Sequence, residues 1–223
     1  MNLGLITYNK KHRKTQEVLR GLRKRNFKNI TLLISNFKKI KKRQILFNHR
    51  PKQFIGLDHL SLKKKYDLKF KKLKKRNIDD LDKILVCGSG LLPKELLVKN
   101  NKIINCHSGL IPLSRGLDSF KWAIKNLFKI GNTLHYIDEN VDLGKIISHK
   151  VTKLYAKDTL TSFAKRHYYN EINMLINFDK YIRISNKINL KKKKSSKRMP
   201  IKFEKNLEEY FLIYKKKFLN KYV

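Results

Sequence analysis

The stretch NLGLITYNKKHRKTQEVLRGLRKRNFKNITLLIS, residues 2–35, places a charged segment between two short apolar runs. Each run, at residues 2–8 and 29–35, has the length and composition of a buried strand. Between them, Val18 and Leu22 are spaced to lie on one face of a helix. A strand, a helix and a second strand in this order predict two parallel strands with a covering helix. The opening of the chain therefore indicates an α/β fold.

The alternation continues downstream and extends this fold over residues 1–184. Further strands are expected at 83–87, 103–107, 132–138 and 145–151, and further helices at 93–97, 117–128 and 159–182. Residues 36–76 are rich in lysine and are expected to mix a loop with a helix. We predict one Rossmann-like domain, with a mostly parallel sheet and helices on both faces. Residues 185–223 are expected to form a basic linker and a short C-terminal helix. Whether this helix packs back on the domain stays open.

The formal net charge of +37 raises the question of a nucleic-acid partner. Only 11 of the 54 basic residues are arginine, the side chain best suited to base and phosphate recognition. Lysine, asparagine, isoleucine, phenylalanine and tyrosine also have A/T-rich codons, so genome composition is favoured over a nucleic-acid partner as the origin of the charge. Weak binding to anionic polymers is expected in either case. The hydrophobic fraction of 41% excludes a disordered chain.

The two cysteines, Cys87 and Cys106, form no CxxC pair and are expected to be buried in a reducing compartment. The apolar run at the N-terminus is shorter than a signal-peptide core. No window approaches the roughly 18 uncharged apolar residues that a membrane span needs. A soluble, cytoplasmic protein is therefore expected.

Asn105 and His107 lie two residues apart at the carboxyl end of a predicted strand, so their side chains leave the same face. Ligands bind at this edge of an open parallel sheet. Asp142 stands in a later loop that can reach the same edge. A neutral donor, a titratable donor and a carboxylate together suit acyl transfer to an amine. On spacing alone, a structural histidine remains the alternative.

Three segments carry a family resemblance: GSGLLPKELL, NCHSGLIPLSRGLDSFKWAI and GNTLHYIDENVDLGKIISHKV, at residues 88–97, 105–124 and 131–151. Their order and spacing resemble the folate-dependent formyltransferases, which include phosphoribosylglycinamide, methionyl-tRNA and sugar N-formyltransferases. The resemblance covers about residues 81–151 well and the N-terminal segment loosely. It implies the formyltransferase fold, 10-formyltetrahydrofolate as co-substrate, a primary amine as acceptor and no metal.

The resemblance also implies a role for each matched residue. Asn105 and His107 would donate hydrogen bonds to the oxyanion, and Asp142 would orient His107 and help remove the amine proton. The pterin ring would lie against Leu91, Leu92, Pro93, Asp138, Val141 and Gly144. The acceptor side would be formed by Ser108, Gly109 and Arg115. His135 matches a position that supports the site, although a purely structural role is equally expected.

The acceptor is predicted from departures within the family. The turn TYNKKHRKT, residues 7–15, lacks the glycines that grip phosphate in glycinamide ribonucleotide enzymes. Phosphate could still be bound there by Asn9, Lys10, Lys11, Arg13 and Lys14. About forty residues follow Ile184, too few for the second barrel of methionyl-tRNA enzymes.

The segment RGLDSFKWAI resembles the sugar branch, so an amino-sugar nucleotide is the first expectation. Glycinamide ribonucleotide and methionyl-tRNA remain alternatives. A non-catalytic relative that binds RNA or other anions is the alternative of another class. The oligomeric state stays open.

Overall fold

A computed structural model describes residues 1–36, 44–97, 102–138 and 144–219. Its centre is a seven-stranded sheet in the order β3-β2-β1-β4-β5-β6-β7. The strands are β1 Leu3–Tyr8, β2 Ile30–Ser35, β3 Lys69–Lys72, β4 Lys83–Val86, β5 Ile103–His107, β6 Gly131–Tyr136 and β7 Ile146–Val151. Neighbours from β3 to β5 are parallel, whereas β6 runs antiparallel to both β5 and β7. The predicted α/β fold with a mostly parallel sheet is confirmed.

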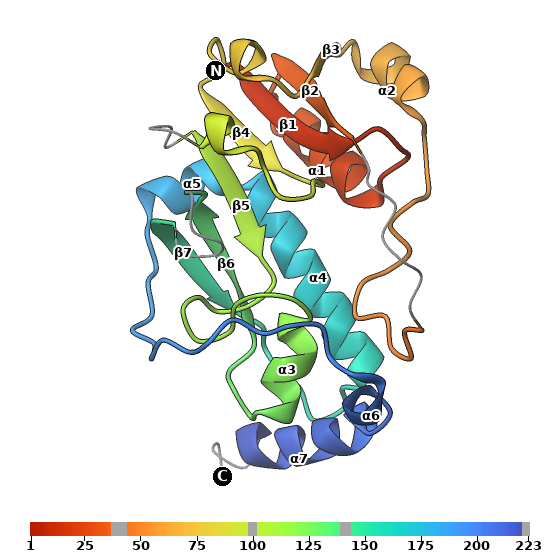
Figure 1. Ribbon diagram of the computed structural model, residues 1–223, viewed down its shortest axis with the longest axis vertical. Coiled ribbons are helices and arrows are strands. Elements are labelled where there is room, and N and C mark those ends of the chain that lie inside the picture. Colours follow the sequence, from red (N-terminus) through yellow and green to blue (C-terminus); the bar gives the residue numbers. More distant parts are fainter. Residues whose placement is uncertain (37–43, 98–101, 139–143, 220–223) are drawn as a thin grey trace.

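Nine helical segments surround the sheet in the described part of the chain (Figure 1). The α-helices are α1 Arg13–Lys24, α2 His59–Tyr66, α3 Ser119–Lys125, α4 Leu160–Ile176, α5 Phe178–Arg183, α6 Ile201–Glu204 and α7 Leu207–Leu219. Two 3₁₀ turns, η1 Lys75–Asn77 and η2 Lys94–Leu96, complete the set. Most of these elements follow directly from the apolar pattern of the sequence.

The two faces of the sheet are covered differently. On one face, Leu5 of β1 packs in a cluster with Val18 of α1 and Met174 of α4. On the other face, Ile6 packs with residues beside η1 and η2, including Leu96. Leu5 and Ile6 serve opposite faces because strand side chains alternate. Each of these fully buried side chains contributes about 1.5–3 kcal/mol, so both layers anchor the strand that leads into the site edge.

Three helices differ from their predicted extents, and the one predicted at 117–128 is confined to α3, Ser119–Lys125. Residues 93–97 form only a 3₁₀ turn, since Leu96 N–H donates to Pro93 O at 3.0 Å. The helix predicted at 159–182 is divided at Asn177 into α4 and α5. Arg25 explains the break, because its guanidinium donates to Ile176 O at 2.5 Å and to both oxygens of Asp179. The guanidinium thereby gives a hydrogen-bond partner to a carbonyl at the end of α4, and it pairs with a carboxylate in the first turn of α5.

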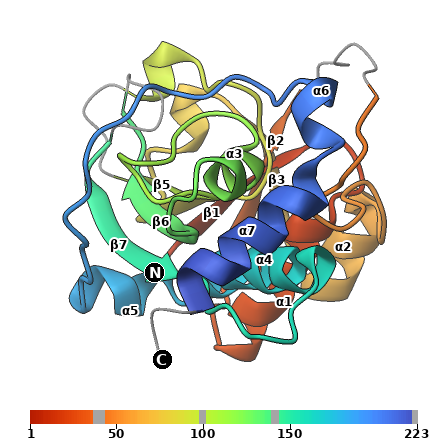
Figure 2. The same cartoon turned by 90° about the horizontal axis from the view of Figure 1, so that it is seen from below.

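The segment predicted as a solvated linker, residues 185–200, instead follows a fixed course across the loop after β5 (Figure 2). Ser196 forms a parallel bridge with Gly116, and Lys193 N–H donates to Pro112 O at 3.1 Å. Met199 is fully buried. The sequence left the packing of the C-terminal helix open, and the structure shows α7 lying against α3 with Phe211 buried. A domain division at residue 184 stays a prediction.

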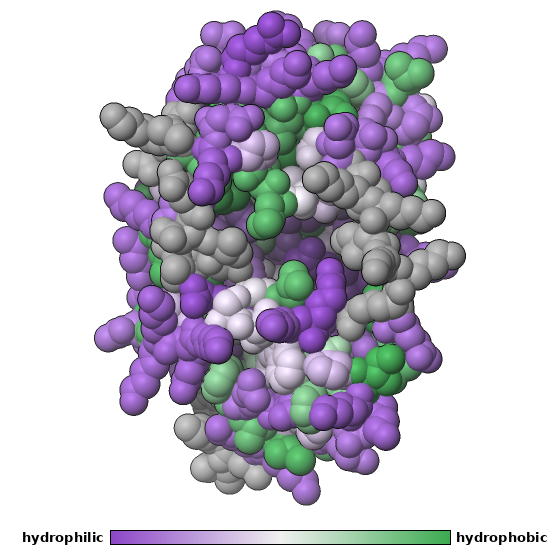
Figure 3. Space-filling view, viewed as in Figure 1, coloured by the Kyte–Doolittle hydropathy of each residue, from purple (hydrophilic) through white to green (hydrophobic). Residues whose placement is uncertain are grey.

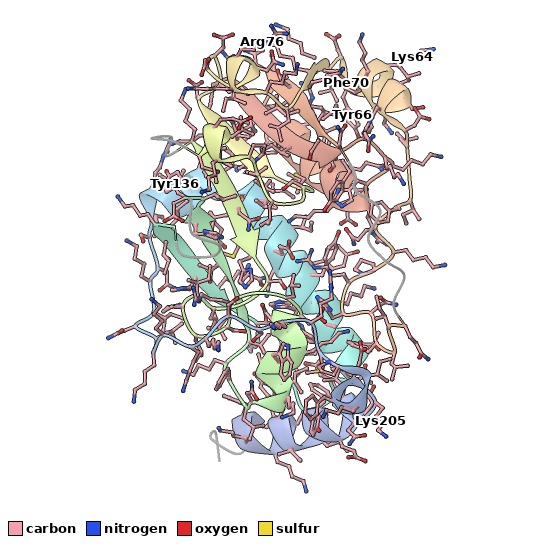
Figure 4. The ribbon with its side chains drawn as sticks, viewed as in Figure 1. Lys64, Tyr66, Phe70, Arg76, Tyr136 and Lys205 are labelled. Carbon is pink, nitrogen blue, oxygen red and sulfur yellow. The ribbon has the colours of Figure 1, made fainter. Side chains whose placement is uncertain are left out.

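Polar side chains dominate the surface drawn in Figure 3. In Figure 4, Lys64 and Arg76 lie at one end of the molecule and Lys205 lies at the other. Within the described ranges, no helix combines the length and apolar character needed to cross a bilayer. Cys87 and Cys106 are free and buried, as predicted, and burial raises the pKa of Cys87 to about 12.

Candidate functional site

The strand β5 stands where the sheet changes direction, parallel to β4 on one side and antiparallel to β6 on the other. Figure 1 shows β1, β4 and β5 pointing toward the middle of the molecule, and the surface in Figure 3 is hollowed there. Asn105 and His107 leave one face of β5 at this edge, as their spacing predicts. The edge is the place where parallel α/β sheets bind ligands.

Asn105 is oriented by a histidine of the neighbouring strand. The two residues are register partners, and Asn105 Nδ2 lies 3.4 Å from His135 Nε2. His135 Nδ1 is 3.0 Å from Tyr136 O, which can only accept. The proton therefore sits on Nδ1, and Nε2 accepts from the Asn105 amide. His135 is buried, and this contact favours its supporting role over a structural role remote from the site.

His107 is held by the loop that follows it. Its Nε2 lies 3.0 Å from Ser114 O and 3.1 Å from Ser119 Oγ. Because a carbonyl oxygen only accepts, Nε2 carries a proton. The Ser119 hydroxyl donates to Gly116 O at 2.8 Å, so a lone pair of Oγ is left to accept from Nε2. Neither serine was predicted, because no periodicity or motif marks a backbone carbonyl of a loop or the first residue of a helix as the partner of a strand side chain.

Strands β6 and β7 fix the same loop from behind. The buried Thr133 hydroxyl accepts from Ile111 N–H at 2.9 Å and donates to Gly109 O at 2.7 Å. His149 Nε2 donates to Ile111 O at 2.8 Å. Burial lowers the pKa of His149, which keeps this ring neutral. Thr133 and His149 stand beside other polar residues in their strands, so no sequence signal sets them apart.

Two glycines among the predicted site residues let backbone segments approach closely. A Cβ on Gly109 would lie 2.3 Å from Ser114 O and 2.9 Å from His107 Nε2. A Cβ on Gly144 would lie 1.8 Å from Tyr136 O, at the end of β6 (Figure 4). Gly109 thus packs behind His107. Gly144 brings the loop after β6 against the sheet.

The other predicted residues fall into three groups. Leu91, Leu92 and Pro93 form the turn after β4, where Leu91 is 86% exposed. Asp138 is half-buried just beyond β6, and Ser108 is buried beside His107. Asp142 and Val141 lie outside the described residues.

Arg115 points toward residues 185–200, here called the C-terminal segment. Its side chain is 9% exposed and donates from Nη2 to Lys193 O at 3.2 Å. The structure therefore gives this side chain a contact that holds the C-terminal segment on the loop. Its predicted contact with the acceptor stays a prediction.

The turn after β1 contains a charge network that the sequence did not predict. Lys14 of α1 lies 2.5 Å from Glu171 of α4, and Arg50 lies 2.8 Å from the other oxygen. Glu171 is fully buried, and burial opposes its ionisation, but Arg50 and Lys14 outweigh this and lower its pKa. Arg13 pairs with Glu17 at 2.9 Å. Two of the cations expected to bind phosphate, Arg13 and Lys14, are therefore paired within the protein.

His12 completes this turn as a neutral residue. Burial, followed by the charges of Lys14 and Arg50, lowers its pKa to about 4. Its Nδ1 lies 2.9 Å from the Thr15 hydroxyl. Arg50 remains 34% exposed at the side chain, so this guanidinium brings positive charge to the same edge of the sheet. The described ranges contain no group of three or more His, Cys, Asp or Glu arranged to hold a metal.

Comparison with known proteins places this geometry in context. Residues 5–178 match the family described as formyl transferase. A phosphoribosylglycinamide formyltransferase of Bacillus subtilis is 36% identical over 66 residues. That match spans 29% of this chain and 34% of the relative, about a third of its length.

Solved structures resemble the whole fold. An N-formyltransferase from Helicobacter canadensis, complexed with folinic acid and dTDP-3-aminofucose, has a TM-score of 0.62 at 17% identity, covering 97% of this chain and 82% of that one. Phosphoribosylglycinamide formyltransferase from Anaplasma phagocytophilum has a TM-score of 0.56 at 21% identity, covering 82% and 85%. At these identities the likeness extends to the fold alone.

Proposed function

Because the chain belongs to the formyl transferase family, we propose that it moves a formyl group from 10-formyltetrahydrofolate to a primary amine. The observation that carries the proposal is the arrangement at the end of β5. There the Asn105 amide is oriented by His135, and His107 is oriented by Ser114 and Ser119. Two oriented polar side chains at a ligand-binding edge suit a reaction that develops negative charge on a carbonyl oxygen.

The amine nitrogen attacks the formyl carbon, and the carbonyl electrons move to oxygen. The Asn105 N–H and the positive charge of the His107 ring stabilise this oxyanion. The hydrogen-bond acceptors at His107 Nε2 bind a cationic ring more strongly than a neutral one. They therefore favour the cationic ring, which is the form that stabilises an oxyanion best. The Asp142 carboxylate, carried over from the family resemblance, orients His107 and helps remove the amine proton. Collapse of the tetrahedral adduct breaks the bond between the formyl carbon and the folate nitrogen. Tetrahydrofolate then leaves with a proton on that nitrogen, and the formyl group stays on the amine.

We assign the folate pocket to the turn after β4 and the loop after β6. The residues proposed to surround the pterin are Leu91, Leu92, Pro93, Asp138, Val141 and Gly144. The exposed Leu91 supports this assignment, because an apolar side chain on a ligand-binding edge gains from being covered by a planar ring. The close approach that Gly144 permits keeps the second loop against the end of β6.

For the acceptor, we propose an amino-sugar nucleotide, with Ser108, Gly109 and Arg115 on its side of the site. The turn of residues 7–15 has no glycine and commits Lys14 to a buried ion pair, which disfavours a tight phosphate grip there. Arg50 keeps part of its guanidinium accessible, and a diphosphate is an anion that this group binds well. The Helicobacter neighbour, crystallised with an amino-sugar nucleotide, aligns over nearly the whole chain.

Glycinamide ribonucleotide is the second candidate acceptor. The local identity to the Bacillus subtilis enzyme favours it. The two candidates differ in the group that carries the amine, a hexose ring in one case and a glycyl amide in the other. They are therefore separable by direct assay.

The test is the rate of tetrahydrofolate formation with 10-formyltetrahydrofolate and a panel of amines. dTDP- and UDP-linked amino sugars are expected to support turnover, and His107→Ala and Asn105→Ala are expected to remove it. Turnover with glycinamide ribonucleotide alone would reverse the order of the acceptors. An absence of turnover and folate binding, together with salt-sensitive RNA binding, would favour the non-catalytic relative.

A further inference from the structure

We infer that Ser119 is a positioning residue that fixes the His107 ring through its hydroxyl. This inference rests on the proposed function, because it concerns how His107 is made ready for formyl transfer. Ser119 is the first residue of α3, and its side chain is buried. Its Oγ lies 3.1 Å from His107 Nε2, although the two residues are twelve positions apart.

Ser114 and Ser119 hold His107 in different ways. The contact from Ser114 comes from its backbone carbonyl, whereas the contact from Ser119 comes from its side chain. The Ser114 hydroxyl bonds within the loop instead, donating to Ser119 O at 3.2 Å. Only the Ser119 contact can therefore be removed by changing a side chain. This difference supplies a matched pair of buried serines in one loop.

The place of Ser119 is fixed from outside by the C-terminal segment. Leu117 N–H donates to Ser196 O at 2.9 Å, and the Asp118 carboxylate accepts from Met199 N–H at 3.0 Å. Ser119 itself donates to Gly116 O, and Gly116 is the bridge partner of Ser196. The three residues before Ser119 are thus each tied to the C-terminal segment. This connection gives the lysine-rich end of the chain an indirect role in the site.

The geometry leaves one arrangement of protons at this point. Ser119 Oγ–H is directed to Gly116 O, so Oγ accepts from Nε2–H. A carbonyl and a hydroxyl acceptor on one ring nitrogen fix the ring in its plane and keep the proton on Nε2. A histidine oriented in this way loses less entropy when it binds the oxyanion. Loss of the hydroxyl is expected to lower kcat more than it raises KM.

The experiment compares Ser119→Ala, Ser114→Ala and Ser119→Thr in the full chain. Ser119→Ala is expected to lower kcat about tenfold with KM for both substrates within about twofold, the scale of one lost hydrogen bond. Ser114→Ala keeps the carbonyl contact with His107 and loses only the bond from its hydroxyl to Ser119 O, so its kcat is expected to fall clearly less than that of Ser119→Ala. Ser119→Thr keeps a hydroxyl and is expected to restore most of the loss.

A second readout needs no substrate. In ¹⁵N-labelled protein, the Nε2–H resonance of His107, assigned with His107→Gln, is expected to shift and to exchange faster with water in Ser119→Ala but not in Ser114→Ala. Equal spectra and equal kcat for the two alanine variants would overturn the inference. A spectral change in a protein with no formyl transfer would instead show that the proposed function fails while the positioning holds.

Discussion

The loop after β5 and the turn after β1 meet at the same edge of the sheet, but they are fixed by different forces. The loop that holds His107 uses neutral hydrogen bonds from Ser114, Ser119 and Thr133. The turn that leads into α1 uses the buried charges of Lys14 and Glu171. Burial first, and then the charges of Lys14 and Arg50, lower the pKa of His12, and such charges would likewise perturb a nearby catalytic histidine.

The two kinds of contact have different consequences for stability and for catalysis. Buried ion pairs hold helices together but make the fold sensitive to the loss of either partner. Neutral contacts are individually weaker, yet they orient His107 without opposing positive charge on its ring. We therefore expect substitutions at the turn after β1 to act mainly on stability and those at the loop after β5 to act mainly on turnover.

The largest expected effect is on the turn after β1. Glu171→Ala leaves Lys14 buried without its partner, and this is expected to lower the free energy of unfolding by about 3–5 kcal/mol. Denaturant unfolding measures the change. The control is Asp179→Ala, which removes a partly exposed pair with Arg25 and is expected to change stability by about 1 kcal/mol or less. Equal losses in the two variants would contradict the role given to the buried network.

Substitutions at the end of β5 are expected to have the opposite signature. His107→Ala and Asn105→Ala each remove an oxyanion donor, which is expected to lower kcat/KM by about 100- to 1,000-fold. Both side chains are only partly buried, so the melting temperature is expected to change little. Steady-state kinetics and thermal unfolding on the same preparations test this. A large loss of stability with nearly normal turnover would reverse the comparison.

Acid is expected to weaken the turn after β1. Because the pKa of His12 is lowered from 6.5 to about 4, the unfolded chain binds more protons between these values. The stability from neutral His12 is complete above pH 6.5 and is lost as the pH falls toward 4, by at most about 3 kcal/mol. Unfolding curves for wild type and His12→Gln are expected to converge over this range. Curves that stay parallel would argue against a buried neutral His12.

The smallest expected effect concerns the packing of Gly109 in the loop after β5. In Gly109→Ala the new methyl group would displace the Ser114 carbonyl from His107, with an expected loss of about tenfold in kcat. Gly90→Ala is the control, and its kcat is expected to hold. Among the residues that the structure describes, its two chain neighbours aside, no heavy atom lies within 4 Å of the position that the new methyl group would take. Activity assays on both variants decide the point. A normal rate in Gly109→Ala would mean that the Ser114 contact is dispensable.

Local patterns in the sequence predicted the placement of Asn105 and His107 and every strand except β3, which lies in the lysine-rich stretch expected to mix a loop with a helix. Alternation along β5 sets the shared face, and a parallel sheet sets the edge, so both follow from residues close together in the chain. The helix break at Asn177 was not predictable, because it depends on Arg25, more than 150 residues away. The prediction for Asp142 stays a prediction, since this residue lies outside the described ranges.

Long-range contacts also explain what the sequence missed at the site. Lys14 and Glu171 are 157 residues apart, and each looks like an ordinary surface charge in isolation. The C-terminal segment has a run of exposed lysines, which is typical of a linker, yet its backbone bonds to the loop at Gly116. Side-chain polarity reports the exposed surface of such a segment. It carries no information about the partners of its backbone groups.

Asn105 and His107 are proposed to serve the transfer of a formyl group. The most direct measurement follows a ¹³C-labelled formyl group from 10-formyltetrahydrofolate by NMR in the presence of a dTDP-linked amino sugar. With wild type, the label is expected to appear as a formamide on the acceptor. With the double variant Asn105→Ala/His107→Ala, it is not. Label transfer at the same rate by the double variant would contradict the proposal.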